Sequence, residues 1–115
     1  QNLCIAYQDI LKKHKLYATS TTGQMIEDVA NLKIHKLLAG HFGGMQQMGS
    51  KISNNEIDLL IFLQDPANKK RTPDFYNVLN LCDQYNIPCA TNLPTAEVLI
   101  LALDRGDLDW RNMYK

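Results

Sequence analysis

The feature that most constrains the fold is the alternation of short apolar segments with segments of helical period. The clearest apolar segment, residues 57–63, is nearly continuous in aliphatic and β-branched residues, which is typical of a parallel strand covered on both faces. Three further strands are expected at residues 16–19, 32–38 and 87–91. Because a turn and a helical pattern follow each one, the sequence predicts an α/β fold with parallel strands and right-handed crossovers.

Helices are expected before, between and after these strands, at residues 3–11, 23–30, 43–53, 73–85 and 95–103. Pro73 is well placed as the first residue of its helix. Asn54-Asn55 and Asn86 are expected to end two helices, and Asn92 or Thr95 can cap the last one. The tail from residue 104 onward carries Leu108, Trp110 and Tyr114, which are expected to anchor it on the domain or on a neighbouring subunit.

Size and composition set the broad class. A chain of 115 residues suits a single domain with one core. Twelve basic and twelve acidic residues cancel, so the overall charge favours neither nucleic acid nor an anionic membrane. The three cysteines have no metal-ligand spacing and predict buried thiols in a reducing compartment. Without a signal sequence or an apolar run of roughly 20 residues, we expect a cytoplasmic protein that does not enter membranes.

Four loops are expected at the carboxyl ends of the strands, where ligands bind in such folds. The first, residues 19–23, combines four hydroxyls with backbone amides at a helix start, where a phosphate would fit, although this motif alone favours an ordinary N-cap. The second, residues 39–46, is rich in glycine and allows either a close approach to a ligand or a simple turn. Together the two loops favour an anion site.

Two carboxylates follow in the third loop, at residues 64–74. Asp65 and Asp74 are candidates for acid or base chemistry, although Asp65 can simply end a strand and Asp74 can complement a helix dipole. The histidines, His14, His35 and His41, lack a metal-ligand pattern, so no metal site is expected.

Three segments carry a family resemblance. Residues 16–23 read Leu-Tyr-Ala-Thr-Ser-Thr-Thr-Gly, residues 43–49 read Gly-Gly-Met-Gln-Gln-Met-Gly, and residues 86–92 read Asn-Ile-Pro-Cys-Ala-Thr-Asn. In this order they resemble the motifs of the methylglyoxal synthase family, in particular its Leu-Tyr-Ala-Thr-Gly-Thr-Thr-Gly and Gly-Gly-Asp-Gln-Gln patterns. Shorter matches at Asp65-Pro66 and Pro73-Asp74 extend the resemblance over nearly the whole chain.

The resemblance implies a three-layer helix/sheet/helix fold with a parallel sheet of order 3-2-1-4-5. The family's first strand would lie before Gln1, so we expect residues 1–115 to form a single methylglyoxal-synthase-like domain that is incomplete at its N-terminus. Without that central strand, the sheet would contain a gap flanked by unpaired backbone groups. The family also implies a homo-oligomer, with a hexamer as the expected form.

The resemblance further implies chemistry on a small phosphorylated metabolite. Methylglyoxal synthase converts dihydroxyacetone phosphate to methylglyoxal and phosphate without metal or organic cofactor, by abstraction of a proton beside the carbonyl. Matching positions assign Thr19, Thr21, Thr22 and Gly40 to the phosphate, and Asp65 and Asp74 to the supporting acidic residues.

The departures from the family pattern fall on groups that contact the substrate. Met45 stands at the position of the catalytic aspartate, Ala39 replaces a phosphate-binding serine, and residues 69–72 lack the family's histidine. We therefore expect a phosphate-binding protein that is impaired or inactive as a synthase. The alternatives are an active carbon–oxygen lyase that uses Asp65 or Asp74 as its base, and a regulatory metabolite-binding domain.

Overall fold

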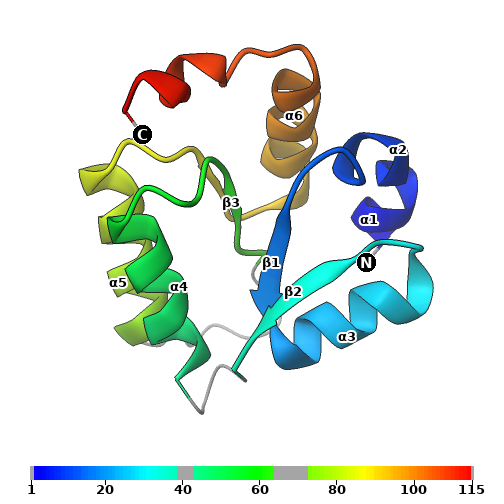
Figure 1. Ribbon diagram of the computed structural model, residues 1–115, viewed down its shortest axis with the longest axis horizontal. Helices are drawn as coiled ribbons and strands as arrows, with labels where there is room; N and C mark the ends of the chain where they lie inside the picture. Colours follow the sequence, from blue (N-terminus) through cyan, green and yellow to red (C-terminus); the bar gives the residue numbers. More distant parts are fainter. Residues whose placement is uncertain (1, 39–42, 64–72, 115) are drawn as a thin grey trace. The chain divides into compact units, whose positions relative to one another are not determined.

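The protein is an α/β structure with parallel strands, as the sequence predicts (Figure 1). The computed structural model describes residues 2–38, 43–63 and 73–114. The chain divides into two compact units, Gln1–Gln47 and Met48–Lys115, and each unit is described by itself. That the whole chain forms a single domain stays a prediction.

The first unit is built around two paired strands. Helices α1 (Asn2–Ala6) and α2 (Gln8–Leu11) precede β1 (Leu16–Thr19), α3 (Ser20–Val29) and β2 (Ile34–Leu37). The strands pair in parallel from Leu16 opposite Ile34 to Thr19 opposite Leu37. In Figure 1, α3 runs alongside the two strands.

Gly23 lets α3 lie directly on these strands. A β-carbon at this position would lie 3.0 Å from Lys36 Cγ and 3.1 Å from Ile34 Cγ2, both in β2. These distances are shorter than most contacts of a β-carbon, so a side chain here would force Lys36 or Ile34 to shift. The glycine therefore favours close packing of the helix and is not needed for the backbone conformation.

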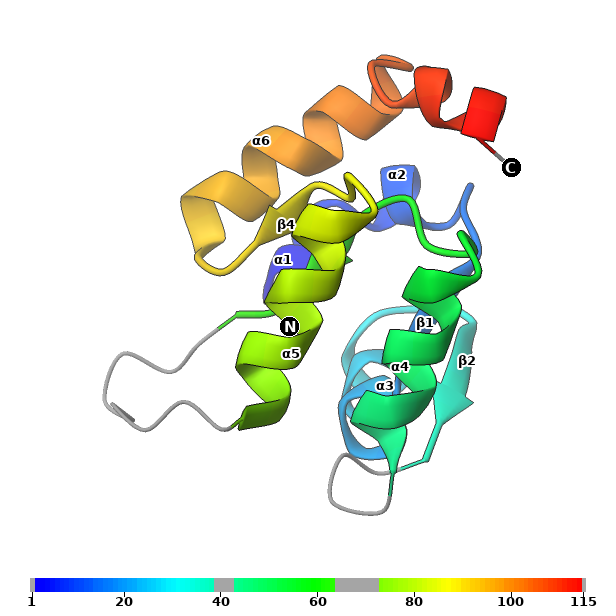
Figure 2. The same ribbon diagram turned by 90° about the vertical axis from the view of Figure 1, so that its left-hand side faces the viewer.

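The second unit contains another parallel pair. Helix α4 (Gly44–Ser53) begins in the first unit and ends in the second, followed by β3 (Leu60–Ile61), α5 (Pro73–Gln84), β4 (Cys89–Ala90), α6 (Leu93–Asp104) and the 3-10 helix η2 (Asp109–Tyr114). Strands β3 and β4 pair in parallel, with Leu60 opposite Cys89. Figure 2 shows α6 continuing through a turn into the C-terminal tail. In the order 3-2-1-4-5, which counts the family's strands, β1 and β2 correspond to the neighbouring strands 2 and 3. Strands β3 and β4 correspond to the neighbouring strands 4 and 5.

The core of each unit consists of aliphatic side chains from its helices and strands. In the first unit these are Leu3, Leu11, Ala18, Ala30, Leu32 and Ile34. In the second they are Met48, Ile52, Ile57, Leu60, Phe75, Val78, Cys82, Ile87, Ala90, Ala96 and Ile100. Gly49 brings α4 close to α5, because a β-carbon there would lie 3.2 Å from Leu81 Cδ1.

Several predicted boundaries were wrong. The first helix is interrupted at Tyr7, and α3 begins at Ser20 rather than Gly23, so the predicted hydroxyl loop is the first turn of that helix. Asn92, not Thr95, caps α6, since its Oδ1 accepts a hydrogen bond of 3.0 Å from the Thr95 amide.

The ends of three helices follow one local rule. Asn55, Asn86 and Gly106 have φ values of 62°, 55° and 83° and close α4, α5 and α6. The next amide in each case bonds back across the turn, as Ile87 N does to Cys82 O at 2.8 Å. This is the Schellman arrangement, in which asparagine or glycine accepts the left-handed conformation that ends a helix. The prediction that Asn55 and Asn86 end helices is therefore confirmed.

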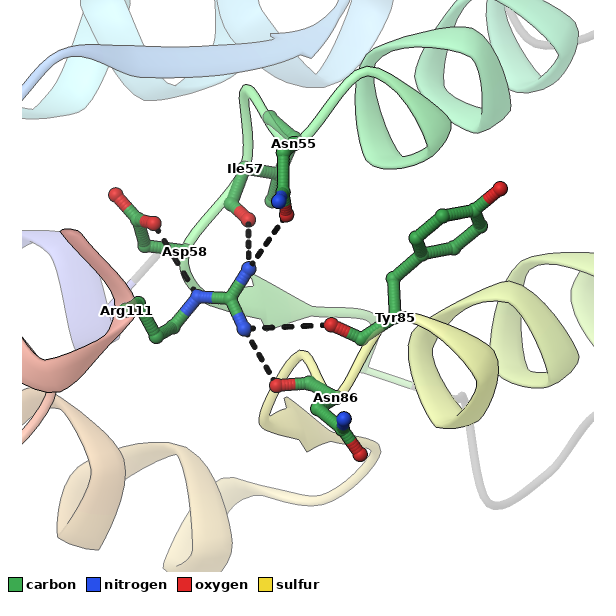
Figure 3. A network of polar contacts seen from close by, with 6 residues as sticks. All are labelled: Asn55, Ile57, Asp58, Tyr85, Asn86 and Arg111. Carbon is green, nitrogen blue, oxygen red and sulfur yellow. Dashed lines mark hydrogen bonds and ion pairs between the residues drawn. The ribbon is translucent and has the colours of Figure 1, made fainter. Parts of the chain in front are cut away.

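Arg111 joins two of these helix ends to the tail (Figure 3). Its side chain is 2% exposed and donates to Asn55 Oδ1 at 3.1 Å, Asn86 O at 2.5 Å and Asp58 Oδ1 at 3.2 Å. Further bonds reach the carbonyl oxygens of Ile57 and Tyr85. Arg111 binds Ile57 O just before β3 and Asn86 O before β4. Strand β3 is shorter than the predicted 57–63.

Arg111 thus anchors the tail on the second unit through a charged side chain. Trp110 is 43% exposed, and Met113 is more exposed still. The expectation that Leu108, Trp110 and Tyr114 anchor the tail on the domain or on a neighbouring subunit stays a prediction. A guanidinium can pair with several carbonyls at once, which no apolar side chain can do.

Replacing Arg111 should destabilise the second unit strongly. In Arg111→Met, several buried acceptors lose their donor and Asp58 loses its partner, so the free energy of unfolding should fall by about 2–4 kcal/mol in urea denaturation. Arg105→Met is the control, because the Arg105–Asp107 ion pair at 2.8 Å is exposed and should contribute less than about 1 kcal/mol. Equal effects of the two substitutions would contradict the anchoring role.

Candidate phosphate site at the ends of two parallel strands

Two helices begin at the same edge of the β1–β2 sheet. Helix α3 follows β1 directly, and α4 begins at Gly44, after β2 and residues 38–43. Since the strands are parallel, with Thr19 opposite Leu37, their carboxyl ends lie at one edge. Neither α3 nor α4, both fully described, carries an acidic residue in its first turn. Helix N-termini of this kind attract anions through their unpaired amides and dipole.

The N-terminus of α3 carries three of the predicted phosphate-binding residues. Thr19 occupies the N-cap position in an extended conformation, but its side chain makes no capping hydrogen bond. Thr21 and Thr22 lie exposed in the first turn. The hydroxyl of Thr19 is therefore not committed to an ordinary cap, and the site offers hydroxyl and amide donors together.

The N-terminus of α4 is fixed by its glycine and by Gln47. Gly43 has φ of +101°, a conformation that side-chain-bearing residues rarely adopt. The Leu38 amide donates a hydrogen bond of 2.6 Å to Gln47 Oε1, which ties the end of β2 to the first turns of α4. Met45 is the second residue of this helix and is half-exposed.

The remaining predicted site residues lie outside the described residues or in the second unit. Gly40 and Asp65 lie outside the described residues, as do Ala39 and residues 69–72. Asp74 is the second residue of α5, in the second unit, and is half-buried. Its position in the first turn is one where a carboxylate stabilises a helix.

One carboxylate of α3 with a structural role escaped the sequence analysis. Glu27 of α3 forms an ion pair with Lys36 and accepts a hydrogen bond of 3.1 Å from the Ile34 amide. The Lys36 and Ile34 hydrogen bonds hold the pKa of Glu27 below its usual value. Glu27 holds α3 against β2. This role becomes visible only once α3 packs on this strand in the folded structure.

The cysteines form no metal site in the described structure. The Cys82 thiol hydrogen bonds to Cys89, and this bond together with burial raises the pKa of Cys82. The same hydrogen bond lowers the pKa of Cys89, against the opposing effect of burial. Within residues 2–38, 43–63 and 73–114, no three His, Cys, Asp or Glu side chains gather as a metal ion would require. None of the helices in these ranges is long and apolar enough to span a membrane.

Comparison with known proteins decides the family. The family described as "MGS-like domain" matches residues 2–91. The chain belongs to the methylglyoxal synthase family.

Curated relatives in the methylglyoxal synthase family match most of this chain. Methylglyoxal synthase of Caldicellulosiruptor saccharolyticus is 54% identical over 110 residues, which cover 95% of this chain and 78% of the relative. The Clostridioides difficile enzyme is 51% identical over 113 residues, covering 97% and 82%. A crystal structure of methylglyoxal synthase from Elizabethkingia anophelis superposes with a TM-score of 0.76 at 33% identity, over 86% of this chain and 66% of that one.

Most residues that segment 43–49 shares with the methylglyoxal synthase family have a structural role in this chain. Gly43 supplies a left-handed turn, Gln47 binds the Leu38 amide, and Gly49 allows the contact with Leu81. Gly23 likewise allows α3 to contact β2. These residues maintain the fold, so their presence does not depend on catalysis.

The Glu27 ion pair predicts a dependence of stability on pH. The pKa of Glu27 is lowered from 4.5, so its contribution is complete above that value and is lost as the pH falls through the lower pKa of the folded state. Glu27→Gln should therefore lower the melting temperature at pH 7 and should have little effect near pH 3. Thermal unfolding followed by circular dichroism at both pH values tests this, with the exposed Glu56→Gln as control. The same difference in melting temperature between Glu27→Gln and the unmodified protein at both pH values would refute the prediction.

Proposed function

We propose that this member of the methylglyoxal synthase family binds the phosphate of a small phosphorylated metabolite at the N-terminus of α3. We propose also that it is impaired or inactive in converting dihydroxyacetone phosphate to methylglyoxal and phosphate. One observation carries both parts: the α3 terminus presents uncommitted hydroxyl and amide donors, whereas Met45 occupies the first turn of α4, where the family motif has its aspartate.

Phosphate binding is supported by the chemistry of this helix terminus. The amides of the first turn of α3 have no partners within the helix, and no carboxylate in that turn opposes an anion. Thr19, Thr21 and Thr22 add hydroxyl donors, and hydrogen bonds to a charged group are each worth about 1.5–3 kcal/mol. Gly40 completes the proposed site by its match to the family motif.

Loss of the synthase reaction follows from the side chain at position 45. Elimination of phosphate begins when a base removes a proton from the carbon beside the carbonyl, and a positioned base contributes about 10²–10⁴-fold to such a step. The thioether of Met45 cannot take up a proton at neutral pH. Asp65 and Asp74 are the remaining acidic residues of the motif, and an active enzyme would require one of them to act as the base.

Restoring the aspartate tests this part. In Met45→Asp, we expect methylglyoxal release from dihydroxyacetone phosphate to rise by about 100-fold or more over the unmodified protein. Met113→Asp introduces the same charge at a residue that is 84% exposed in the tail and should not raise the rate.

Two outcomes of this assay would contradict the proposal that Met45 is the cause of lost activity. A high rate in the unmodified protein that falls in Asp65→Asn or Asp74→Asn would show that one of these carboxylates is the base. A protein that binds phosphate but stays inactive in Met45→Asp would instead favour a regulatory metabolite-binding domain.

The phosphate site can be tested separately with inorganic phosphate. Thr22→Val should weaken phosphate binding by about tenfold, because one hydrogen bond to a charged group is lost. Thr95→Val is a matched control, since Thr95 is the third residue of α6 as Thr22 is of α3. Amide chemical shifts during a phosphate titration give the affinity and the location, and equal effects of the two variants would contradict the assignment.

We propose further that the protein is a homo-oligomer, with the hexamer as the expected form. Helix α6 is apolar on most of its sides: Ala96 and Ile100 are buried, whereas Val98 is 63% exposed and Leu93 and Leu101 are also exposed. A helix that is hydrophobic all round is usually buried, which supports an association through α6.

Charge placed on α6 should disrupt this association. We expect Val98→Lys to lower the mass measured by light scattering, and Gln84→Lys, at the exposed end of α5, to leave it unchanged. A monomeric unmodified protein, or an unchanged mass in Val98→Lys, would contradict the proposed interface.

A further inference from the structure

A polar cavity lies at the edge of the β1–β2 sheet opposite to the proposed phosphate site. It has a volume of about 320 Å³ and is lined by Lys12, His14, Lys15, Asn31, Lys33 and His35, over Leu16 and Leu32. Residues 12–15 lead into β1, and residues 31–33 lead into β2, so the cavity lies at the amino ends of both strands. The proposed phosphate site lies at their carboxyl ends and shares no residue with it.

The lining of this cavity is strongly cationic. Three lysines and two histidines face it, and no aspartate or glutamate is among its lining residues. The whole chain has twelve basic and twelve acidic residues, so this grouping does not reflect a basic composition. Asp9 pairs with Lys12 at 3.2 Å, but its side chain is 93% exposed, and such a surface pair is weak enough for a bound anion to replace it.

Some of these groups are held in place before any ligand binds. Lys15 Nζ lies 5.3 Å from the centroid of the Tyr17 ring, and that ring lies 5.5 Å from the His35 ring. Tyr17 and His35 are opposite one another in the paired strands. The cation–aromatic contact and the strand pairing therefore fix one wall of the cavity, which lowers the entropic cost of binding.

The size and the donor set indicate the class of ligand. A volume of about 320 Å³ fits a small molecule rather than a macromolecular chain. All the permanent cations are lysines, which bind phosphate as point charges, whereas planar carboxylates are recognised best by the fork of arginine. Lys12 and Lys15 approach from one segment and Lys33 from another, so the positive charge is divided between two sides of the cavity.

We propose that this cavity binds a small anion carrying two or more phosphoryl groups, such as inorganic pyrophosphate or a nucleoside diphosphate. One phosphoryl group lies near Lys12 and Lys15 and the other near Lys33, with His14, Asn31 and His35 donating hydrogen bonds. This site is independent of the phosphate site at α3.

Pyrophosphate titration of the whole protein, followed by amide chemical shifts, tests the proposal. We expect saturable shifts at residues 12–16 and 31–35. Lys33→Gln and Lys12→Gln should each weaken pyrophosphate binding by about tenfold. Lys13→Gln, which removes the same charge from the same turn but is not among the lining residues, should weaken it less than twofold.

The outcomes distinguish this site from the phosphate site at α3. Pyrophosphate shifts confined to residues 19–22, or equal effects of Lys33→Gln and Lys13→Gln, would overturn the proposal. Citrate binding at residues 31–35 as tightly as pyrophosphate would overturn the phosphoryl assignment. The absence of shifts at residues 19–22 with inorganic phosphate would refute only the site at α3. Binding in the cavity is monitored separately, by the amide shifts of residues 12–16 and 31–35.

Discussion

The direct contact of α3 with a pair of parallel strands is the constraint on which the proposed site depends. Without a side chain at Gly23, the helix lies against Lys36 and Ile34 of β2, and Glu27 secures it by binding the Ile34 amide and Lys36. Because the helix follows β1 without an intervening loop, its first turn is held at the carboxyl edge of the strands. The hydroxyl and amide donors of the first turn of α3 are therefore held in place by the contacts that Gly23 and Glu27 make with β2.

The strand positions and several helix ends could be predicted from the sequence because their causes are local. The four strands of the described structure lie within the segments predicted as strands, and Asn55 and Asn86 indicated the ends of α4 and α5. The buried Arg111 could not be predicted, since its acceptors lie up to 56 residues away in the chain. For the same reason the basic cavity was missed, because the segments before β1 and β2 become neighbours only when the strands pair.

The shared family motif separates into residues that maintain the fold and residues that perform the chemistry. Gly43, Gln47 and Gly49 each have a structural role in this chain, so a protein can keep them after catalysis is lost. Met45 lies among them in the first turn of the same helix and has no acid–base capacity. Family membership and fold therefore follow from the comparisons, whereas the proposed loss of the reaction rests on the side chain of Met45.

The most direct test of the account measures proton abstraction itself. Dihydroxyacetone phosphate is incubated with the unmodified protein in deuterated water, and the hydrogens beside its carbonyl are followed by NMR. The account predicts that the ligand perturbs the amides of Thr19 to Thr22 while these hydrogens exchange no faster than without protein. Protein-dependent exchange of these hydrogens would show that a base other than residue 45 removes the proton, and would contradict the account.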